Sequence, residues 1–120
     1  MSVNANGLRN NLTRKIIFNE IAKLDIDICL IQESFITDQS LNNFQKDWNG
    51  ELIYSPGTEH SLGNIILLSK NFVYMNLKIE KLTNRIICIS FEMDAEKYMI
   101  LNVYYPCDEQ GKCNLHNELT

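Results

Sequence analysis

The hydrophobic pattern near the start of the chain predicts a helix and, directly after it, a buried strand. Residues 26–31 are apolar apart from Asp27, which is typical of a strand covered on both faces. Between residues 12 and 24, apolar side chains instead recur at spacings of three and four, which predicts an amphipathic helix capped by Asn10 or Asn11. A helix between two strands tends to place them parallel in one sheet, so the start of the chain is expected to form the partner strand. The apolar positions of the predicted helix are Leu12, Ile16, Ile17, Ile21 and Leu24.

The remaining apolar runs predict a short helix and several further strands. A helical turn is expected at 41–48, with Leu41, Phe44 and Trp48 as its inner face. Residues 94–97 are expected to link two antiparallel strands. The strands are expected at 51–55, 65–68, 72–82, 86–93 and 98–104. Period-two spacing predicts one hydrophobic core, made of Ile28, Leu30, Ile66, Leu68, Ile87, Ile89, Leu101 and Val103 together with Ile17 and Ile21.

Length and composition indicate one domain over residues 1–120. The chain is 45% hydrophobic and 22% charged, as expected of a globular protein. No membrane span or signal peptide is visible, so an intracellular location, nuclear or cytoplasmic, is expected. The net charge of −4 does not suggest nucleic-acid binding, but a locally basic cleft would be compatible with it. The first helical region is locally basic, with Arg9, Arg14, Lys15 and Lys23. A solvated helix face with no binding role would show the same charges.

The four cysteines do not predict a metal site. Cys29 and Cys88 lie within apolar strand-like runs and are expected to be small buried hydrophobes. Cys107, Cys113 and His116 form a C-x5-C-x2-H pattern, which is not a standard zinc spacing and has no fourth ligand nearby. A structural disulfide is not expected in an intracellular protein either.

Glu33 is the first candidate for chemistry, because it follows directly on the buried strand at 26–31. A carboxylate at the end of such a strand is held in place, and it is an oxygen ligand of the kind that Mg²⁺ prefers. An ordinary solvated loop residue would show the same pattern. Asn4 and Asn6 precede Gly7 and the first helix, and amide oxygens can also serve as ligands. If the two strands are parallel, these side chains lie at one edge of the sheet.

The stretches around these residues resemble a known family. S-x-N-x-N-G-L-R at 2–9, followed by L-I-Q-E-S at 30–34, is similar to the opening of the endonuclease/exonuclease/phosphatase superfamily. The closer likeness is to its exonuclease III and apurinic-endonuclease branch, and within that branch to the endonuclease domains of LINE-type retrotransposons. Residues 61–69 resemble the family's glycine-started strand, and residues 84–91 with 101–106 resemble its paired core strands and N-x-Y-x-P turn.

The resemblance implies a fold class and an activity. The fold would be α/β, or more specifically α+β: half of a four-layer α/β/β/α sandwich, with a mixed sheet and a covering helix. The activity would be cleavage of phosphodiester bonds in DNA with Mg²⁺ or Mn²⁺. Asn4, Glu33 and Tyr104 would be catalytic, and Glu33, Asn4 and Asn6 would hold the metal. The main alternatives are an inositol-phosphate or lipid phosphatase of the same superfamily and a non-catalytic binding module.

The second half of the family's pattern is missing. Neither its G-D-F-N motif nor its S-D-H motif, with the catalytic histidine, occurs in the sequence. His60 and His116 stand in other contexts and are expected at the surface. Cys107 replaces the asparagine that usually follows the proline of the turn. The chain is therefore interpreted as the N-terminal part of one such domain, inactive alone. Its one sheet is expected to keep an apolar face exposed unless the missing C-terminal half or another chain covers it.

Overall fold

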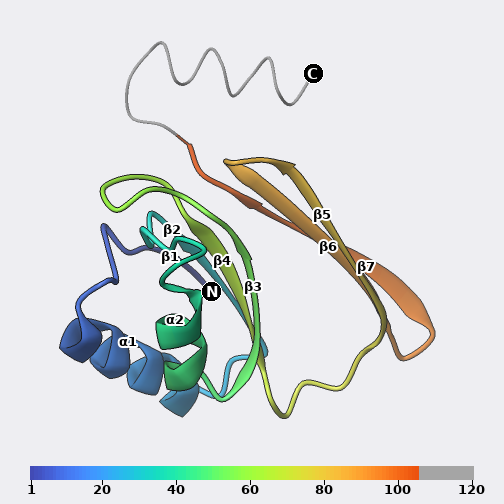
Figure 1. Cartoon of the computed structure of the whole chain (residues 1–120). Helices are drawn as coiled ribbons and strands as arrows, with labels where there is room; N and C mark the ends of the chain where they lie inside the picture. Colours follow the sequence, from blue (N-terminus) through green and yellow to red (C-terminus); the bar gives the residue numbers. More distant parts are fainter. Residues whose placement is uncertain (106–120) are drawn as a thin grey trace.

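The structure is a computed structural model that describes residues 1–105 (Figure 1). It consists of two stacked β-sheets, with two helices covering the outer face of the first sheet. The first part of the chain forms β1 (Ser2–Asn4), α1 (Asn11–Lys23), β2 (Ile28–Gln32), α2 (Leu41–Asp47), β3 (Gly50–Ser55) and β4 (Asn64–Ser69). The second part forms β5 (Met75–Thr83), β6 (Ile86–Met93) and β7 (Glu96–Val103). No helix within 1–105 is long and apolar enough to cross a membrane.

The first sheet is mixed, as the sequence predicted. Its strand order is β1-β2-β4-β3, in which β1 runs parallel to β2 and the other pairs are antiparallel. The connection from β1 to β2 passes through α1, so the predicted strand–helix–strand unit is confirmed. The α/β sandwich is confirmed as well, because helices, mixed sheet and second sheet form successive layers.

Helix α1 begins where predicted but presents a different face to the sheet. The Asn10 side chain caps it by accepting a hydrogen bond from the Thr13 amide at 3.0 Å. The buried positions are Arg14, Phe18 and Ile21. Of the predicted apolar stripe, Leu12, Ile16 and Leu24 are instead 68%, 54% and 57% exposed. The difference arises because the Arg14 guanidinium is buried by interactions with distant residues, which helical spacing cannot reveal.

Arg14 is held by hydrogen bonds and by an aromatic ring. Its Nε lies 2.7 Å from a carboxylate oxygen of Asp47, at the end of α2, and its Nη1 donates to the Leu8 carbonyl at 3.1 Å. Its guanidinium also lies over the Phe44 ring, 4.7 Å from the centroid. A buried guanidinium is tolerated only when its donors are paired, as they are in this position.

The first hydrophobic core lies between the helices and the first sheet. Phe18 packs edge-on against Phe44 and Trp48, with ring centroids 6.4 and 5.9 Å away. The predicted inner face of α2 is therefore confirmed. The Trp48 indole N–H donates to the Leu68 carbonyl at 3.1 Å, so this large side chain is buried without losing its hydrogen bond. The other buried members are Leu8, Ile21, Cys29, Ile31, Ile36, Ile65 and Leu67.

A second sheet covers the inner face of the first, which corrects the expectation of a single sheet with an exposed apolar face. Its order is β5-β6-β7, and all its pairs are antiparallel. The β6–β7 hairpin turns through Asp94 and Ala95 alone, with φ of 53° and 65°, so β7 begins at Glu96, earlier than predicted.

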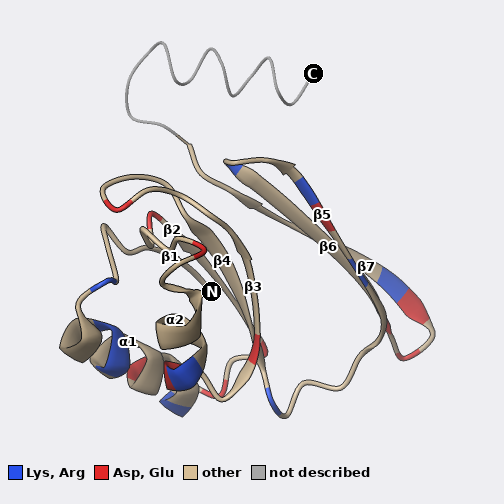
Figure 2. Cartoon of the chain, in the orientation of Figure 1, with Lys and Arg blue, Asp and Glu red and all other residues tan. Residues whose placement is uncertain are grey.

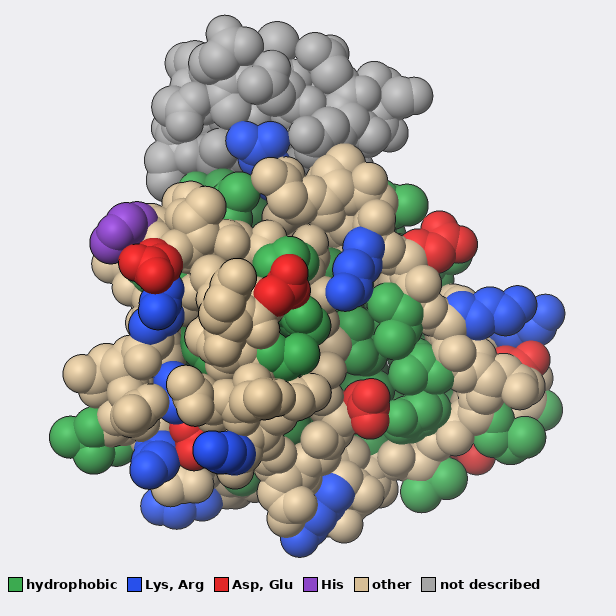
Figure 3. Space-filling model, viewed as in Figure 1, with side chains coloured by type: hydrophobic (Ala, Val, Ile, Leu, Met, Phe, Trp, Pro, Cys, Tyr) green, Lys and Arg blue, Asp and Glu red, His purple; other side chains and the backbone are tan. Residues whose placement is uncertain are grey.

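The two sheets enclose a second core, so the prediction of one core is wrong. Its buried members are Ile53, Ile66, Leu68, Ile87, Ile89 and Phe91, with Ile28 and Leu30 partly buried against them. Ile17 and Ile21 belong to the first core instead. Leu101 is 43% exposed, because its register partner Cys88 places it on the face of β7 that points away from the first sheet. Figure 3 shows apolar side chains in the band between the two sheets.

Strand β4 explains why two cores form. Residues 64–68 are buried without interruption, since the strand is covered on both faces. Ile65 and Leu67 pack toward the helices, and Ile66 and Leu68 pack toward the second sheet. Cys29 and Cys88 are buried as predicted, and burial raises the pKa of both thiols. Predictions that involve Pro106, Cys107, Cys113 and His116 lie outside the described residues.

Candidate active site

The parallel pairing of β1 and β2 brings the two predicted ligand segments to one edge of the first sheet. Asn4 is in register with Gln32, the residue before Glu33. The pairing continues beyond the strands, because the Ala5 amide donates to the Gln32 carbonyl at 2.9 Å and the Gly7 amide donates to the Glu33 carbonyl at 2.6 Å. Asn4 and Glu33 therefore leave neighbouring strands at the same carboxyl edge.

Main-chain hydrogen bonds hold the loops at this edge together. The loop after β1 is joined to the loop after β2 by the Leu8 amide, which donates to the Ser34 carbonyl at 2.9 Å. The loop after β2 is joined in turn to the loop before β4, since the Ser34 amide donates to the Gly63 carbonyl at 3.0 Å. The Ser34 hydroxyl, which is fully buried, donates to the same carbonyl at 2.7 Å. The segment that carries Glu33 is thus fixed on both sides.

A cluster of residues with positive φ lies in the same loops. Asn6, Glu33 and Phe35 have φ of 49°, 54° and 62°. Gly7 has φ of 96°, and a Cβ there would lie 2.7 Å from the Phe35 ring, so only glycine fits. Left-handed conformations of non-glycine residues cost free energy, and they concentrate at functional sites. The backbone at this edge is therefore locally strained, as it also is at some turns elsewhere in the described chain.

The Glu33 carboxylate is partly buried and has no partner among residues 1–105. The side chains of Asn4 and Asn6 are exposed and make no hydrogen bond to another residue in the described part of the chain. No group of three or more His, Cys, Asp or Glu residues that could hold a metal ion occurs within that part. That Asn4 and Glu33 bind one cation together remains a prediction.

Tyr104 follows β7 at the same end of the sandwich. Asn102, near the end of β7, donates hydrogen bonds to carbonyls near the end of β2 and the start of β4, which places the end of β7 at the carboxyl edge. The Tyr104 amide donates to the Arg85 carbonyl at 2.9 Å and extends the pairing with the start of β6. The backbone thus brings Tyr104 to the edge that carries Asn4 and Glu33, while its contact with a phosphate stays a prediction.

Sequence reasoning missed a buried polar network directly below this edge. The Asn102 amide donates to the carbonyls of Ile31 at 3.1 Å and Ile65 at 2.8 Å, and its oxygen accepts from the Gln32 amide at 2.7 Å. The Asn64 amide donates to the Asn102 carbonyl at 3.2 Å. Both asparagines are fully buried. The sequence did contain a signal for this network, namely a polar residue at a core position of an apolar strand. Such buried polar residues normally have hydrogen-bond partners.

A second anchor connects the loop after β2 with β3. The Tyr54 hydroxyl donates to a carboxylate oxygen of Asp38 at 2.7 Å. This hydrogen bond, with smaller effects of burial and of the negative charge, raises the pKa of Tyr54. The nearby loop at 56–63 is tied to the start of the chain by an ion pair of Arg9 and Glu59, at 3.3 Å. His60 in that loop is exposed, as predicted.

The charge distribution gives little support to a basic binding face. Basic and acidic residues are mixed along α1 and along the second sheet (Figure 2). Arg14 is buried against Asp47, so it cannot contribute to a surface that contacts phosphates. Lys23 pairs with Glu20 at 3.3 Å. The locally basic first helix is therefore an ordinary solvated face with one buried arginine.

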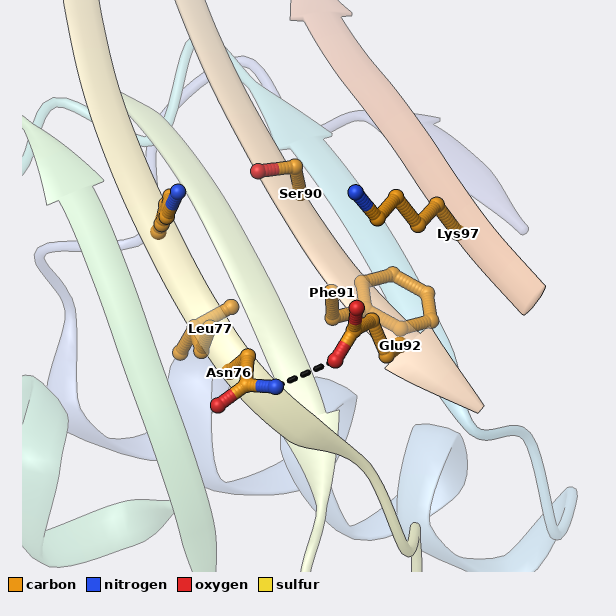
Figure 4. Close-up of a pocket in the computed structure, with 7 residues that line it drawn as sticks. Asn76, Leu77, Ser90, Phe91, Glu92 and Lys97 are labelled. Atoms are coloured by element: carbon orange, nitrogen blue, oxygen red, sulfur yellow. Dashed lines mark hydrogen bonds between the residues drawn. The ribbon is translucent and has the colours of Figure 1, made fainter. Parts of the chain in front are cut away.

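Three hollows lined by described residues lie away from the carboxyl edge. One of about 490 Å³ lies on the outer face of the second sheet, where the Asn76 amide donates to the Glu92 carboxylate beside Lys97 (Figure 4). The others lie beside residues 71–75 and beside Trp48. None of these three is lined by Asn4, Glu33 or Tyr104. The candidate site is a set of converging strand ends, not one of these hollows.

Comparison with known proteins shows the fold. No protein-family model matches the chain, and no curated protein matches it. Among solved structures, the crystal structure of truncated Caenorhabditis elegans TDP2 matches with a TM-score of 0.56, over 87% of this chain and at 18% sequence identity. This chain spans 46% of the TDP2 chain, or about half its length.

The comparison shows a shared fold and goes no further. At this identity, the likeness shows a shared fold alone. It does not by itself assign the chain to the superfamily that the sequence motifs resemble, nor to the LINE-type branch of that superfamily.

Proposed function

We propose that this chain supplies part of a divalent-metal-dependent phosphodiesterase domain that cleaves DNA, of the retrotransposon endonuclease type. The observation that carries the proposal is the parallel β1–β2 pair, which brings Asn4 and Glu33 to one carboxyl edge. The strained backbone of Asn6 and Glu33 supports it, because a protein keeps such conformations where geometry matters. The N-G-L-R stretch after Asn6 favours a nuclease over an inositol-phosphate or lipid phosphatase.

The oxygen ligands offered by Glu33, Asn4 and Asn6 are of the kind that Mg²⁺ or Mn²⁺ prefers. Glu33 offers a carboxylate without a partner in 1–105, and Asn4 and Asn6 offer amide oxygens, all of which suit a hard cation. A bound cation would supply charge to polarise the phosphodiester group. The chain's own part is to hold Glu33 in place through the Ser34 and Gly7 hydrogen bonds. In this proposal Tyr104 contacts the phosphate.

The proposed domain is larger than this chain. TDP2 has more than half of its chain outside the match, and the G-D-F-N and S-D-H motifs are absent from the sequence. We propose that the remaining ligands come from the missing C-terminal half or from another chain. Within residues 1–105, no group of three or more His, Cys, Asp or Glu residues includes Glu33, and this favours a non-catalytic binding module as the second candidate for the chain as it stands.

Paramagnetic relaxation by Mn²⁺ tests the metal site without requiring activity. Mn²⁺ added to the ¹⁵N-labelled chain is expected to broaden the amide signals of Asn4, Asn6 and Glu33 selectively. The Glu33→Gln variant should lose this broadening, because it removes the carboxylate and keeps the shape. Glu51→Gln, at an exposed position of β3, is the matched control and should keep it. Broadening that is unchanged in Glu33→Gln would refute the metal site and favour the binding module.

A further inference from the structure

A hollow of about 430 Å³ lies at the end of the sandwich opposite the candidate site. It forms where the start of β2, the connection from β4 to β5 and the end of β6 meet, at residues 27, 71–75 and 92–94. Asp27 precedes β2 and Glu33 follows it, so this strand of 5 residues puts about 20 Å between them. Figure 1 shows the connection from β4 to β5 at the end of the sandwich away from the end of β7.

Two half-buried aromatic rings form a wall of this hollow. Phe72 and Tyr74 both line it, and their ring centroids lie 5.2 Å apart. Phe91, which is 4% exposed, meets both rings edge-on, with centroids 5.3 and 6.3 Å away. Because Phe91 belongs to the second core, the two rings that rest on it are held in position.

The charged residues around this wall are all acidic. Asp27, Glu92 and Asp94 line the hollow, and none of the described lining residues is Lys or Arg. Glu92 accepts a hydrogen bond from the Asn76 amide, whereas the carboxylates of Asp27 and Asp94 form no hydrogen bond or ion pair with another described residue. The hollow therefore suits a positively charged ligand, and it would repel a phosphate.

We propose that this hollow binds an arginine side chain on an extended segment of another protein. A guanidinium is planar, stacks on aromatic faces and donates N–H groups to carboxylates, so it matches both the aromatic wall and the acidic residues around it. A lysine ammonium is more strongly hydrated and has no flat face, so it fits less well. Val73 and Met75, on either side of Tyr74, are 81% and 65% exposed and would contact apolar residues next to the arginine.

The arginines of this chain make a second copy a poor occupant of the hollow. The sequence contains three of them. Arg9 pairs with Glu59, and Arg14 is buried against Asp47. Arg85 has an interaction partner as well. A second copy would have to break one of these interactions to insert an arginine, whereas a different protein with an exposed arginine would not.

This inference goes beyond the proposed function, because it requires neither a metal nor cleavage. The test adds three capped tripeptides to the full ¹⁵N-labelled chain: valine-arginine-valine, and the same peptide with lysine or with citrulline in the middle. Citrulline keeps the shape of arginine and removes its charge. The arginine peptide is expected to shift the amide signals of 72–75 and 92–94 with a Kd of about 1 mM. The lysine peptide should bind about three-fold more weakly, and the citrulline peptide about ten-fold or more.

Variants of the chain show whether the hollow itself is responsible. The double variant Asp27→Asn/Asp94→Asn should weaken binding of the arginine peptide about ten-fold. Glu80→Gln, at an exposed position of β5 that does not line the hollow, is the matched control and should bind normally. Equal affinity for the three peptides, or for the arginine and lysine peptides alone, would overturn the proposal, and so would unchanged binding by the double variant. Shifts of the same signals with protein concentration, without peptide, would also overturn it, because they would identify a second copy as the occupant.

Discussion

At the scale of single residues, Asn102 joins the two sheets. Its side chain lies on β7, while the groups that it binds lie on β2 and β4. We expect Asn102→Ala to lower the free energy of unfolding by about 2–4 kcal/mol, because two hydrogen bonds are lost and the Gln32 amide loses an acceptor. Urea unfolding followed by circular dichroism measures the change.

The control for this prediction is Asn19→Ala, at an exposed position of α1. It should change the free energy of unfolding by less than about 0.5 kcal/mol. If Asn102→Ala is equally mild, the network below the carboxyl edge does not hold the sheets together, and the position of Tyr104 relative to β2 needs another explanation.

Residue spacing could predict part of the site but not the network around it. Asn4 ends the first strand of one strand–helix–strand unit and Glu33 directly follows the second, and the parallel rule for such units is enough to bring these strand ends together. Gln32 and Asn102 are far apart in the sequence, and their contact depends on how the two sheets stack. Asn102 could be singled out only as a polar residue in an apolar strand, which does not identify its partners.

At the scale of elements, the packing of α1 against α2 depends on the buried pair of Arg14 and Asp47. The two side chains are 3% and 10% exposed. Removing the carboxylate with Asp47→Ala leaves the guanidinium buried without its counter-charge. We expect this change to lower the free energy of unfolding by about 3 kcal/mol. Chemical denaturation of the variant measures it.

The chain provides a matched control for that change. Glu20 and Lys23 form an ion pair within α1, but their side chains are 66% and 73% exposed. Glu20→Ala should cost less than about 0.5 kcal/mol, because exposed pairs contribute little. Similar costs for Asp47→Ala and Glu20→Ala would show that the buried pair does not fix the two helices to each other.

The same pair explains what sequence patterns missed at this scale. Every strand and both helices were predicted near their observed positions, because alternation and helical spacing are local signals. The buried face of α1 was not predicted, since an arginine is expected at the surface unless a buried partner such as Asp47 is known. The apolar run of β4 indicated a buried strand, but it did not show that the chain itself supplies the second sheet that covers it.

At the scale of the whole molecule, the chain forms three layers, namely the helices, the mixed sheet and the second sheet. The candidate site residues lie at one edge of this sandwich. The described residues contribute a single partnerless carboxylate at that edge, and His60 is exposed in a separate loop. Hydrolysis of a phosphodiester needs an activated water and a group that stabilises the developing charge, in addition to a cation ligand. The G-D-F-N and S-D-H motifs of the family that the sequence resembles, which would supply them, are absent from the sequence.

We therefore expect that the purified chain does not nick supercoiled plasmid DNA in the presence of Mg²⁺. Members of a catalytic set act together, and loss of one commonly costs several orders of magnitude in rate. The assay compares the chain with Glu33→Ala, so that a contaminating nuclease is recognised by activity that both samples share. Nicking by the chain that is absent from Glu33→Ala would contradict the expectation. It would show that Glu33 works with groups already present in these 120 residues, or that two chains combine to complete one site.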